Sequence, residues 1–244
     1  MATMKLNEDE RLDDLQLNGL VLVQNKKSFC FGIDAVLLSD FVKAMPGEIV
    51  LDLGTGTGII PILLSAKTKG EKFYGIEIQK ESAELAKRNV DMNNLSDKIF
   101  ITEGDIKTAE SFYPLSSFDV ICTNPPYMKA GAGLLNDFTP KAIARHEIKV
   151  SLYDIISKSA KLLKPQGRFY MIHRPERLTD IMRTLSEHCL EPKKIQFVHS
   201  EVKKEAILVM VEAVRGGNSG LVVLPVKITK HSLDECSKQP GELT

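Results

Sequence analysis

The sequence is poor in cysteine and lacks a long hydrophobic run. The four cysteines form no CxxC pair and no Cys/His cluster with metal-ligand spacing. They are Cys30, Cys122, Cys189 and Cys236. We therefore expect no disulfide framework, no structural zinc site and no bound metal. The longest apolar runs, such as AILVMVEAV, are far shorter than the roughly 20 residues that a membrane-spanning helix needs. Because no signal peptide opens the chain either, we expect a cytoplasmic protein with no membrane partner.

The formal net charge of the 244 residues is zero, which alone would argue against a nucleic-acid partner. The charges are unevenly distributed, however. Residues 140–230 carry 17 Lys and Arg against 9 Asp and Glu, whereas residues 1–139 carry 14 against 20. This asymmetry is expected if one face of the protein meets a polyanion, and it is also expected of solvated helix faces. Charge alone leaves both interpretations open.

From Ile49 onward, short apolar segments with the length of strands alternate with segments that have the pattern of helices. This alternation, with strands that are apolar along most of their length, predicts a mostly parallel sheet covered by helices on both faces. The last two strand-like segments, KKIQFVHS and AILVMVEAV, have no helix between them. They predict a closing antiparallel hairpin.

Upstream of this α/β region, the segment NGLVLVQNKKSFCFGIDAVLLSDFV predicts two short strands joined at residues 25–27, followed by an amphipathic helix. The tail after His231 is polar, as loosely held chain ends often are. We expect three parts: an N-terminal hairpin and helix cap over residues 1–44, an α/β domain over residues 45–230, and a polar tail over residues 231–244.

A glycine-rich turn follows the first strand of the α/β region. In VLDLGTGTG the strand ends near Asp52, glycines stand at positions 54, 56 and 58, and a helix begins near Ile59. Glycines at the carboxyl end of a strand let a ligand approach the backbone beside a helix N-terminus. The dinucleotide fingerprint G-x-G-x-x-G would need its third glycine at Ile59, so the spacing argues against NAD.

Acidic residues stand at the ends of the next two strands. Glu77 is the penultimate residue of the segment YGIEI, at the strand end, where its carboxylate can accept hydrogen bonds from both ribose hydroxyls of a nucleoside. Asp105 follows the third strand, where it can accept from an adenine amino group while Ile106 lies on the ring. A lone acid in such a position is more often a helix cap or a turn residue. Three acids at successive strand ends, counting Asp52, favour a nucleoside pocket.

The motifs DLGTGTG, GIEI, GDI and NPPY, in this order, resemble those of the class I S-adenosylmethionine-dependent methyltransferases over residues 45–215. The resemblance implies a Rossmann-like, three-layer α/β/α fold with a seven-stranded, mostly parallel sheet and an antiparallel last strand. It implies that the three glycines pass close to the methionine portion of the cofactor, Glu77 holds the ribose and Asp105 holds the adenine. The cofactor site is then expected to comprise Asp52, Gly54, Gly56, Gly58, Glu77, Asp105, Ile106 and Asn124.

The segment DVICTNPPY places a polar tetrapeptide, Asn124, Pro125, Pro126 and Tyr127, after the fourth strand. An adenine amino nitrogen is a poor nucleophile because its lone pair is delocalised into the ring. The Asn124 side-chain carbonyl and the Pro125 backbone carbonyl can accept its two hydrogens and favour a tetrahedral nitrogen, while the prolines stiffen the turn. Tyr127 offers a face on which a flipped base can stack. The alternative is a strand terminator, since proline pairs commonly end strands.

A narrower resemblance covers residues 20–230. The motifs FCFGIDAVLLSDF, NPPY, ARHE, HRPERL and EAILVMVEAVRGG together resemble the bacterial tRNA adenine-N(6) methyltransferases, which modify the adenine beside the anticodon of a valine tRNA. The resemblance implies a tRNA partner, and it implies that Phe31 and Asp34 help to close the cofactor pocket. On physical grounds Asp34 is equally suited to be the N-cap of the following helix.

Basic residues of the C-terminal half are expected near strand ends that border the pocket, where they can contact phosphates. They are Arg145 and His146 after the tetrapeptide, Arg174 and Arg177 after the fifth strand, and Lys203, Lys204 and Arg215 near the last two strands. Lys193 and Lys194 precede a strand and are expected at the opposite edge. No role is assigned to His173 and His199.

Three other functions share part of this pattern. A protein-glutamine methyltransferase, which also uses NPPY on a planar amide, would usually carry a separate N-terminal helical domain, and only residues 1–44 precede the core here. A ribosomal-RNA guanine methyltransferase would more often have Phe in place of Tyr127 and a second, duplicated domain. A non-enzymatic RNA- or nucleotide-binding module would not need Asn124 and its prolines. The sequence indicates no oligomeric state.

Overall fold

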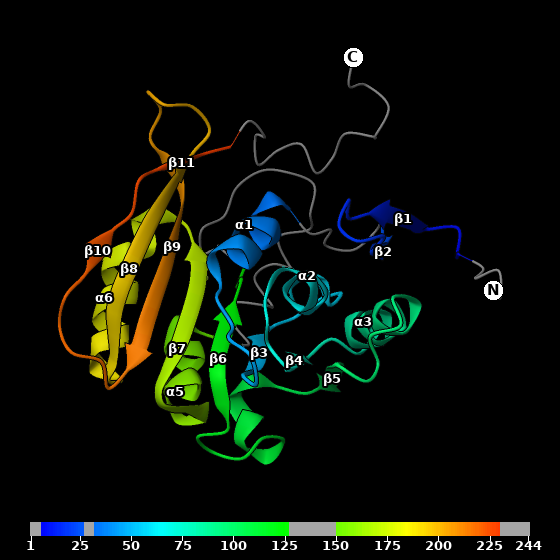
Figure 1. The fold of residues 1–244 in the computed structure, drawn as a ribbon, viewed down its shortest axis with the longest axis horizontal. Coiled ribbons are helices and arrows are strands. Elements are labelled where there is room, and N and C mark those ends of the chain that lie inside the picture. Colours follow the sequence, from blue (N-terminus) through cyan, green and yellow to red (C-terminus); the bar gives the residue numbers. More distant parts are fainter. Residues whose placement is uncertain (1–5, 27–31, 127–149, 230–244) are drawn as a thin grey trace.

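The computed structural model describes residues 6–26, 32–126 and 150–229. Its centre is a nine-stranded sheet with the strand order β10-β8-β9-β7-β6-β3-β4-β5, in which β11 also pairs with β8 (Figure 1). Two of these strands span only two residues each, β10 (Val222–Val223) and β11 (Lys227–Ile228). The seven longer strands are β3 (Ile49–Leu53), β4 (Lys72–Glu77), β5 (Ile99–Glu103), β6 (Phe118–Thr123), β7 (Leu163–His173), β8 (Leu190–His199) and β9 (Ala206–Arg215).

The pairs among the seven longer strands are parallel except those of β9, which runs antiparallel to both β7 and β8. The predicted mostly parallel, seven-stranded sheet with an antiparallel last strand is confirmed, and so is the closing hairpin, β8–β9. The two short strands are an addition that the sequence does not predict, and they extend the sheet beyond β8.

Helices cover both faces of the sheet and complete a three-layer α/β/α arrangement (Figure 1). One face packs against α1 (Ile33–Phe41), α2 (Ile59–Lys67) and α3 (Lys80–Met92). The other face packs against the 3-10 helix η1 (Ile106–Ser111), α5 (Leu152–Leu162) and α6 (Leu178–Glu187). A short 3-10 helix, η2 (Pro175–Arg177), leads into α6.

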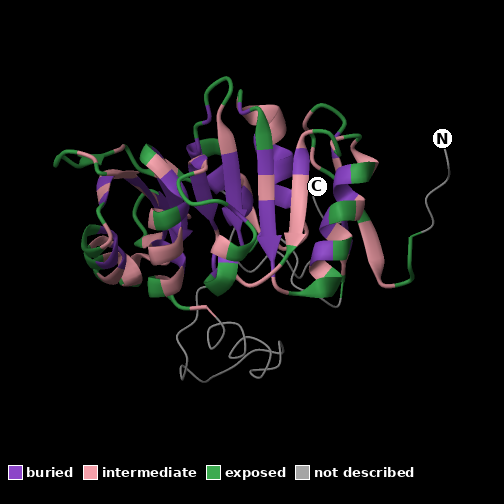
Figure 2. Cartoon of the chain, turned by 90° about the horizontal axis from the view of Figure 1, so that it is seen from below, coloured by how far each residue is buried: buried purple, intermediate pink, exposed green. Residues whose placement is uncertain are grey.

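Neighbouring residues of one strand enter different cores. Val50 and Tyr170 pack with α1 and α2, whereas the adjacent Leu51 and Phe169 pack with α5 and α6. All four are buried, because successive side chains of a strand point to opposite faces and both faces are covered. The central strands are therefore buried along much of their length, while the helices present exposed outer faces (Figure 2).

A separate antiparallel hairpin lies at the N-terminal end, where β1 (Glu10–Asp14) pairs with β2 (Val21–Asn25). The strand that the sequence predicts after residue 27 lies in a segment that is not described, whereas the described partner of β2 is β1, a preceding strand that the sequence analysis does not predict. Residues 27–31 lie outside the described residues. The sequence of β1, ERLDD, lacks the apolar alternation of a half-buried strand. Its one apolar side chain, Leu12, is 49% exposed.

The division into parts at residues 44 and 230 stays a prediction, and the expected polar tail, residues 231–244, lies outside the described residues. Within the described ranges, no helix combines the length and the apolar character that a membrane crossing requires.

Candidate active site

The carboxyl ends of three central strands meet at one edge of the sheet. Leu53, the last residue of β3, pairs with Ile76 of β4 on one side and with Thr123 of β6 on the other. The residues that follow these strands therefore leave the sheet side by side. They are Gly54 after β3, Glu77 at the end of β4 and Asn124 after β6.

The loop between β3 and α2 depends on its glycines. Gly54, Gly56 and Gly58 have φ angles of 76°, 55° and 82°, in the left-handed region that other residues rarely adopt. A Cβ atom on Gly56 would meet nothing within 4 Å, whereas one on Gly58 would lie 3.2 Å from the Cβ of Ala86 in α3. Gly58 thus permits close packing on α3, and Gly56 leaves its backbone open to a ligand.

Glu77 is fixed beside this loop. Its carboxylate is buried, and it accepts hydrogen bonds from the Gly56 N–H at 3.0 Å and from the Gln79 N–H at 2.8 Å. Each bond goes to a different oxygen, and each oxygen retains a second lone pair. The geometry suits the predicted acceptor of ribose hydroxyls.

Asp52 lies on β3 just before the loop, and its side chain is 1% exposed. One carboxylate oxygen, Oδ1, lies 3.7 Å from the Cys122 sulfur, while Oδ2 has no hydrogen-bond partner among the described residues. Burial, with a smaller contribution from the charge of Glu77, raises the pKa of Asp52 to about 7. The Thr55 hydroxyl in the loop and the Cys122 thiol offset part of this rise in the pKa.

Asp105 acts as a helix cap in this structure, as the alternative interpretation of its position predicts. Its Oδ1 accepts from the Lys107 N–H at 2.9 Å at the start of η1. The neighbouring Ile106 is 8% exposed, and its Cδ1 lies 4.0 Å from the position that a Cβ on Gly54 would take. The end of β5 therefore reaches the glycine loop, and contact of Asp105 with an adenine stays a prediction.

The first three residues of the tetrapeptide lie directly beside the glycine loop. The Thr123 hydroxyl donates to the Leu53 carbonyl at 2.9 Å, which ties the end of β6 to the end of β3. Asn124 is half-buried, Pro125 is buried and Pro126 is exposed. The structure thus brings together the predicted cofactor residues and Asn124. Four predicted residues lie outside the described ranges: Phe31, Tyr127, Arg145 and His146.

Two of the predicted phosphate-binding arginines follow β7 at the same edge, but both make contacts within the protein. Arg174 donates from Nη1 to the Ile207 carbonyl at 3.4 Å. Arg177 pairs with Asp180, with Nε 3.2 Å from Oδ2. Contact with RNA stays a prediction for both residues.

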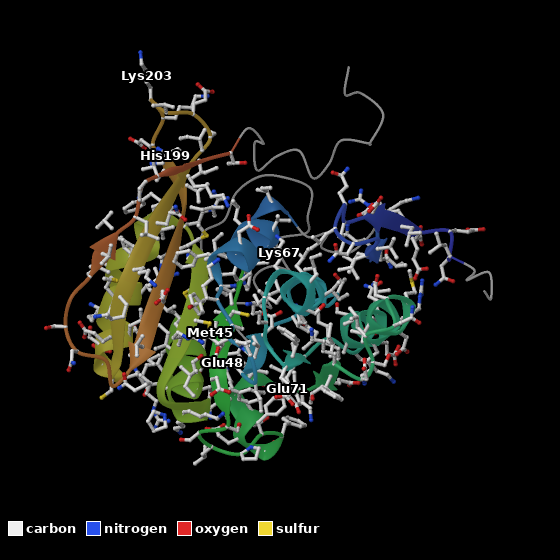
Figure 3. The ribbon with its side chains drawn as sticks, viewed as in Figure 1. Met45, Glu48, Lys67, Glu71, His199 and Lys203 are labelled. Carbon is white, nitrogen blue, oxygen red and sulfur yellow. The ribbon has the colours of Figure 1, made fainter. Side chains whose placement is uncertain are left out.

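The loop between β8 and β9 carries the two predicted lysines. Lys203 stands at the tip of this loop and points away from the sheet (Figure 3). Lys204 is exposed and pairs with Glu201, while its carbonyl lies 2.6 Å from the His199 ring Nδ1. Since β8 runs parallel to β6 and β7, the loop lies at the same edge as Asn124.

The placement of Arg215 at this edge is wrong. Arg215 ends β9, whose antiparallel direction carries it to the opposite edge, where Nη1 donates to the Ser116 hydroxyl at 2.9 Å. Lys193 and Lys194 do lie toward that opposite edge, although they stand within β8 and do not precede it. Lys194 pairs with Glu212 at 2.9 Å.

Two further residues differ from what the sequence suggests. Asp34 lies in the first turn of α1 and is buried, but the N-cap is Gly32, so the prediction of an Asp34 N-cap is wrong.

His173 ends β7 and is 4% exposed, and its Nδ1 accepts from the Arg174 N–H at 2.8 Å. Burial and the charge of Arg177 lower the pKa of His173 to about 4. The sequence offers no signal for this neutral histidine.

The site fits a ligand that carries hydrogen-bond donors and a positive charge. The open side of Gly56, the acceptor oxygens of Glu77 and the buried carboxyl of Asp52 lie around one loop. In the described ranges, no three His, Cys, Asp or Glu side chains gather as a metal site would require. That the protein needs no metal stays a prediction.

This chain is similar in sequence and in fold to known proteins. A family described as "Methyltransferase domain" matches residues 45–216. The tRNA1(Val) (adenine(37)-N6)-methyltransferase of Porphyromonas gingivalis is 33% identical over 187 residues, which cover 74% of this chain and 72% of that protein. The protein of the same name from Aeromonas salmonicida is 27% identical and covers 77% of each chain. Among solved structures, a predicted O-methyltransferase from Agrobacterium tumefaciens, 21% identical, has a TM-score of 0.65 and covers 85% of this chain and 92% of that one.

Proposed function

This chain belongs to the methyltransferase-domain family and, through its curated relatives, to the family of bacterial tRNA1(Val) (adenine(37)-N6)-methyltransferases, and from this premise we propose that it methylates the exocyclic N6 of adenine 37 in a valine tRNA. The methyl donor is S-adenosylmethionine. One observation supports the proposal above the others: Asn124 and Pro125 leave β6 directly beside the glycine loop that leaves β3. The two residues that would hold the adenine amino group and the loop that would hold the cofactor then lie at the same edge of the sheet. The use of tRNA also implies a cytoplasmic location.

The residues that would hold the cofactor come from three strand ends. The loop of residues 54–58 would face the methionine portion, Glu77 the ribose hydroxyls, and Asp105 with Ile106 the adenine. When bound, S-adenosylmethionine supplies an electrophilic methyl group on a sulfonium. The buried carboxyl of Asp52 stands beside this loop as an acidic group that favours positive charge nearby.

Asn124 and Pro125 would orient the nucleophile. Each supplies one carbonyl oxygen, and together they would accept the two hydrogens of the adenine amino group. Held in this way, the nitrogen is favoured as a tetrahedral centre whose lone pair is available, and it is aligned by position, without a strong base. The two prolines limit the backbone freedom of this segment, so that both acceptors keep their places.

Lysines at the same edge would contact the RNA backbone. Lys203 points outward from the tip of the β8–β9 loop, away from other strands of the sheet (Figure 3). Its ammonium group is exposed, as a phosphate contact requires. Lys204 of the same loop pairs with Glu201, so Lys203 presents the exposed positive charge on the edge from which Asn124 emerges, and Lys204 would have to exchange Glu201 for a phosphate.

Methyl transfer to defined RNA tests the proposal. The full chain is incubated with labelled S-adenosylmethionine and an unmodified valine tRNA transcript, and nucleosides are identified by mass spectrometry. We expect N6-methyladenosine from this transcript and none from a matched transcript with guanine at position 37. Equal labelling of both transcripts would contradict the assigned position. Labelling of a glutamine-containing release-factor peptide, with none in RNA, would favour the protein-glutamine alternative.

A further inference from the structure

Two asparagine side chains, Asn89 in α3 and Asn93 at the C-cap of this helix, continue the hydrogen-bond pattern of the N-terminal hairpin. The Asn89 carboxamide accepts from the Val23 N–H at 2.8 Å and donates to the Val23 carbonyl at 3.1 Å. One helical turn later, Asn93 accepts from the Val21 N–H at 2.9 Å and donates to the Val21 carbonyl at 2.8 Å. Alternate residues of a strand direct their backbone groups to the same side. The outer edge of β2 is thus satisfied by side chains in place of a third strand.

Asn89 makes one contact that Asn93 does not. Its Nδ2 also donates to the Thr57 carbonyl at 3.0 Å, in the loop between Gly56 and Gly58. The second donor contact of Asn93 returns to its own helix, at the Asn89 carbonyl. One carboxamide therefore holds both the edge of the hairpin and the middle of the glycine loop.

The Asn89 carboxamide is buried beside the glycine loop. Asn89 is fully buried, with 0% exposure. One turn earlier on α3, Ala86 packs against Gly58 so closely that a Cβ on that glycine would lie 3.2 Å from the Ala86 Cβ. The loop is held between these two positions of α3. A buried carbonyl that loses its donor here is not readily hydrated, so the loss of the Asn89 side chain is expected to disturb the loop itself.

A further contact, an ion pair, fixes the hairpin to α3 without touching the loop. The Arg88 guanidinium donates to both carboxylate oxygens of Glu10 in β1, at 2.8 and 2.6 Å. The hairpin thus has several anchors on α3, of which Asn89 alone, within the described residues, also bonds to the loop of residues 54–58.

We propose that Asn89 is a positioning residue that couples docking of the β1–β2 hairpin to binding of the S-adenosyl cofactor. This inference rests on the proposed cofactor site at residues 54–58. When the hairpin is docked, the Val23 backbone fixes the carboxamide and the carboxamide fixes Thr57. Because such coupling is reciprocal, a ligand that stabilises the loop also strengthens docking of the hairpin.

Cofactor affinity distinguishes coupling from a merely structural role. S-adenosylhomocysteine is titrated calorimetrically into the full wild-type chain, into Asn89→Ala and into the matched control Asn93→Ala, with melting temperatures recorded in parallel. We expect a Kd raised by about tenfold in Asn89→Ala, within the usual range of coupling between sites, and by less than about threefold in Asn93→Ala. Equal losses of affinity in the two variants, at similar melting temperatures, would overturn the proposal.

Amide hydrogen exchange supplies a second measurement on a nearly isosteric variant. Asn89→Asp keeps an acceptor for the Val23 N–H and loses the donor to Val23 and Thr57. In the wild type, S-adenosylhomocysteine should slow exchange at the Val21 and Val23 amides. In Asn89→Asp this slowing should be lost at Val21, and its persistence would contradict the coupling. A wild-type chain that shows the coupling but does not methylate valine tRNA would contradict the proposed substrate and support this inference.

Discussion

Asp52 and Cys122 are cross-strand neighbours on β3 and β6, with the Cys122 sulfur 3.7 Å from Asp52 Oδ1. Both side chains are buried, and a thiol is only a weak hydrogen-bond donor, so the pair stabilises the ionised carboxylate little. Burial raises the pKa of the Cys122 thiol well above its ordinary value, and the adjacent Asp52 raises it further. With its own pKa at about 7, the Asp52 carboxyl titrates near neutral pH.

The substitution Asp52→Asn should therefore stabilise the protein more at high pH than at low pH. Because the pKa of Asp52 is higher in the folded than in the unfolded chain, the folded state binds more protons between about pH 4 and about pH 7, and stability falls as pH rises through this window. The free energy of unfolding of Asp52→Asn minus that of the wild type should rise by up to about 1.4 kcal/mol per pH unit there. Urea unfolding across the window measures it.

Titration of His173 changes the stability of the protein in the opposite direction. The wild-type free energy of unfolding must therefore be subtracted from that of Asp52→Asn at each pH. The His173 pKa of about 4 lies below that of an unfolded histidine, so the unfolded state binds more protons up to about pH 6.5 and stability rises with pH. The two trends oppose each other in the wild type. A difference between Asp52→Asn and wild type that stays constant with pH would contradict the raised pKa of Asp52.

Glu77→Ala should weaken binding of S-adenosylhomocysteine by about 1 to 3 kcal/mol, because ribose hydroxyls would lose their acceptor and the Gly56 N–H would lose its partner. Calorimetry measures the affinity. Glu103→Ala is the matched control, since Glu103 pairs with Glu77 in the sheet register but is exposed. If both variants bind as the wild type does, Glu77 does not hold the ribose.

Asn124→Ala should slow methyl transfer at saturating cofactor by roughly 100-fold or more, comparable to the loss of one positioned transition-state hydrogen bond. Single-turnover transfer to unmodified valine tRNA is the assay. Tyr127→Phe should be mild, whereas Tyr127→Ala should lose about 1 to 3 kcal/mol of base stacking. A rate loss in Asn124→Ala that only follows a fall in melting temperature would indicate that the segment serves to end β6.

The double substitution Lys203→Ala with Lys204→Ala should reduce the salt dependence of tRNA binding. Each phosphate contact that is lost lowers the slope of log affinity against log salt by about 0.7 to 0.9. Filter binding at several salt concentrations measures the slope. Lys72→Ala with Lys193→Ala removes the same charge from the opposite edge and should leave the slope unchanged. Equal slopes for both double variants would place Lys203 and Lys204 on a solvated surface.

Much of the fold could be predicted because strand and helix patterns alternate along the chain. The apolar strands from Ile49 onward identify a sheet buried on both faces, and residues that end successive parallel strands must meet at one edge. This reasoning brings the glycine loop, Glu77 and Asn124 together, as the structure confirms. The predicted antiparallel direction of the last strand also implies the observed position of Arg215, since an antiparallel strand ends at the other edge of the sheet.

The remaining features depend on tertiary contacts that leave little trace in the sequence. β1 is a polar strand held by pairing with β2 and by the Glu10–Arg88 ion pair. Asn89 in α3 and Asn93 at its C-cap are of a residue type that is usually solvated at the surface, and the docked hairpin gives both of them backbone partners on β2. Such contacts between distant segments, the Asn89 bond to the Thr57 carbonyl among them, are determined by the assembled fold.

The chain after β9 returns along the outer side of β8, where β10 pairs with Lys194 and Ile195 and β11 pairs with Val198 and His199 (Figure 1). Backbone groups of β8 that would otherwise recruit a strand from another molecule are thus used within the same chain. At the other end of the described sheet stands β5, which is half as long as β8. By pairing with β8, β10 and β11 therefore protect the longer edge of the sheet from edge-to-edge aggregation.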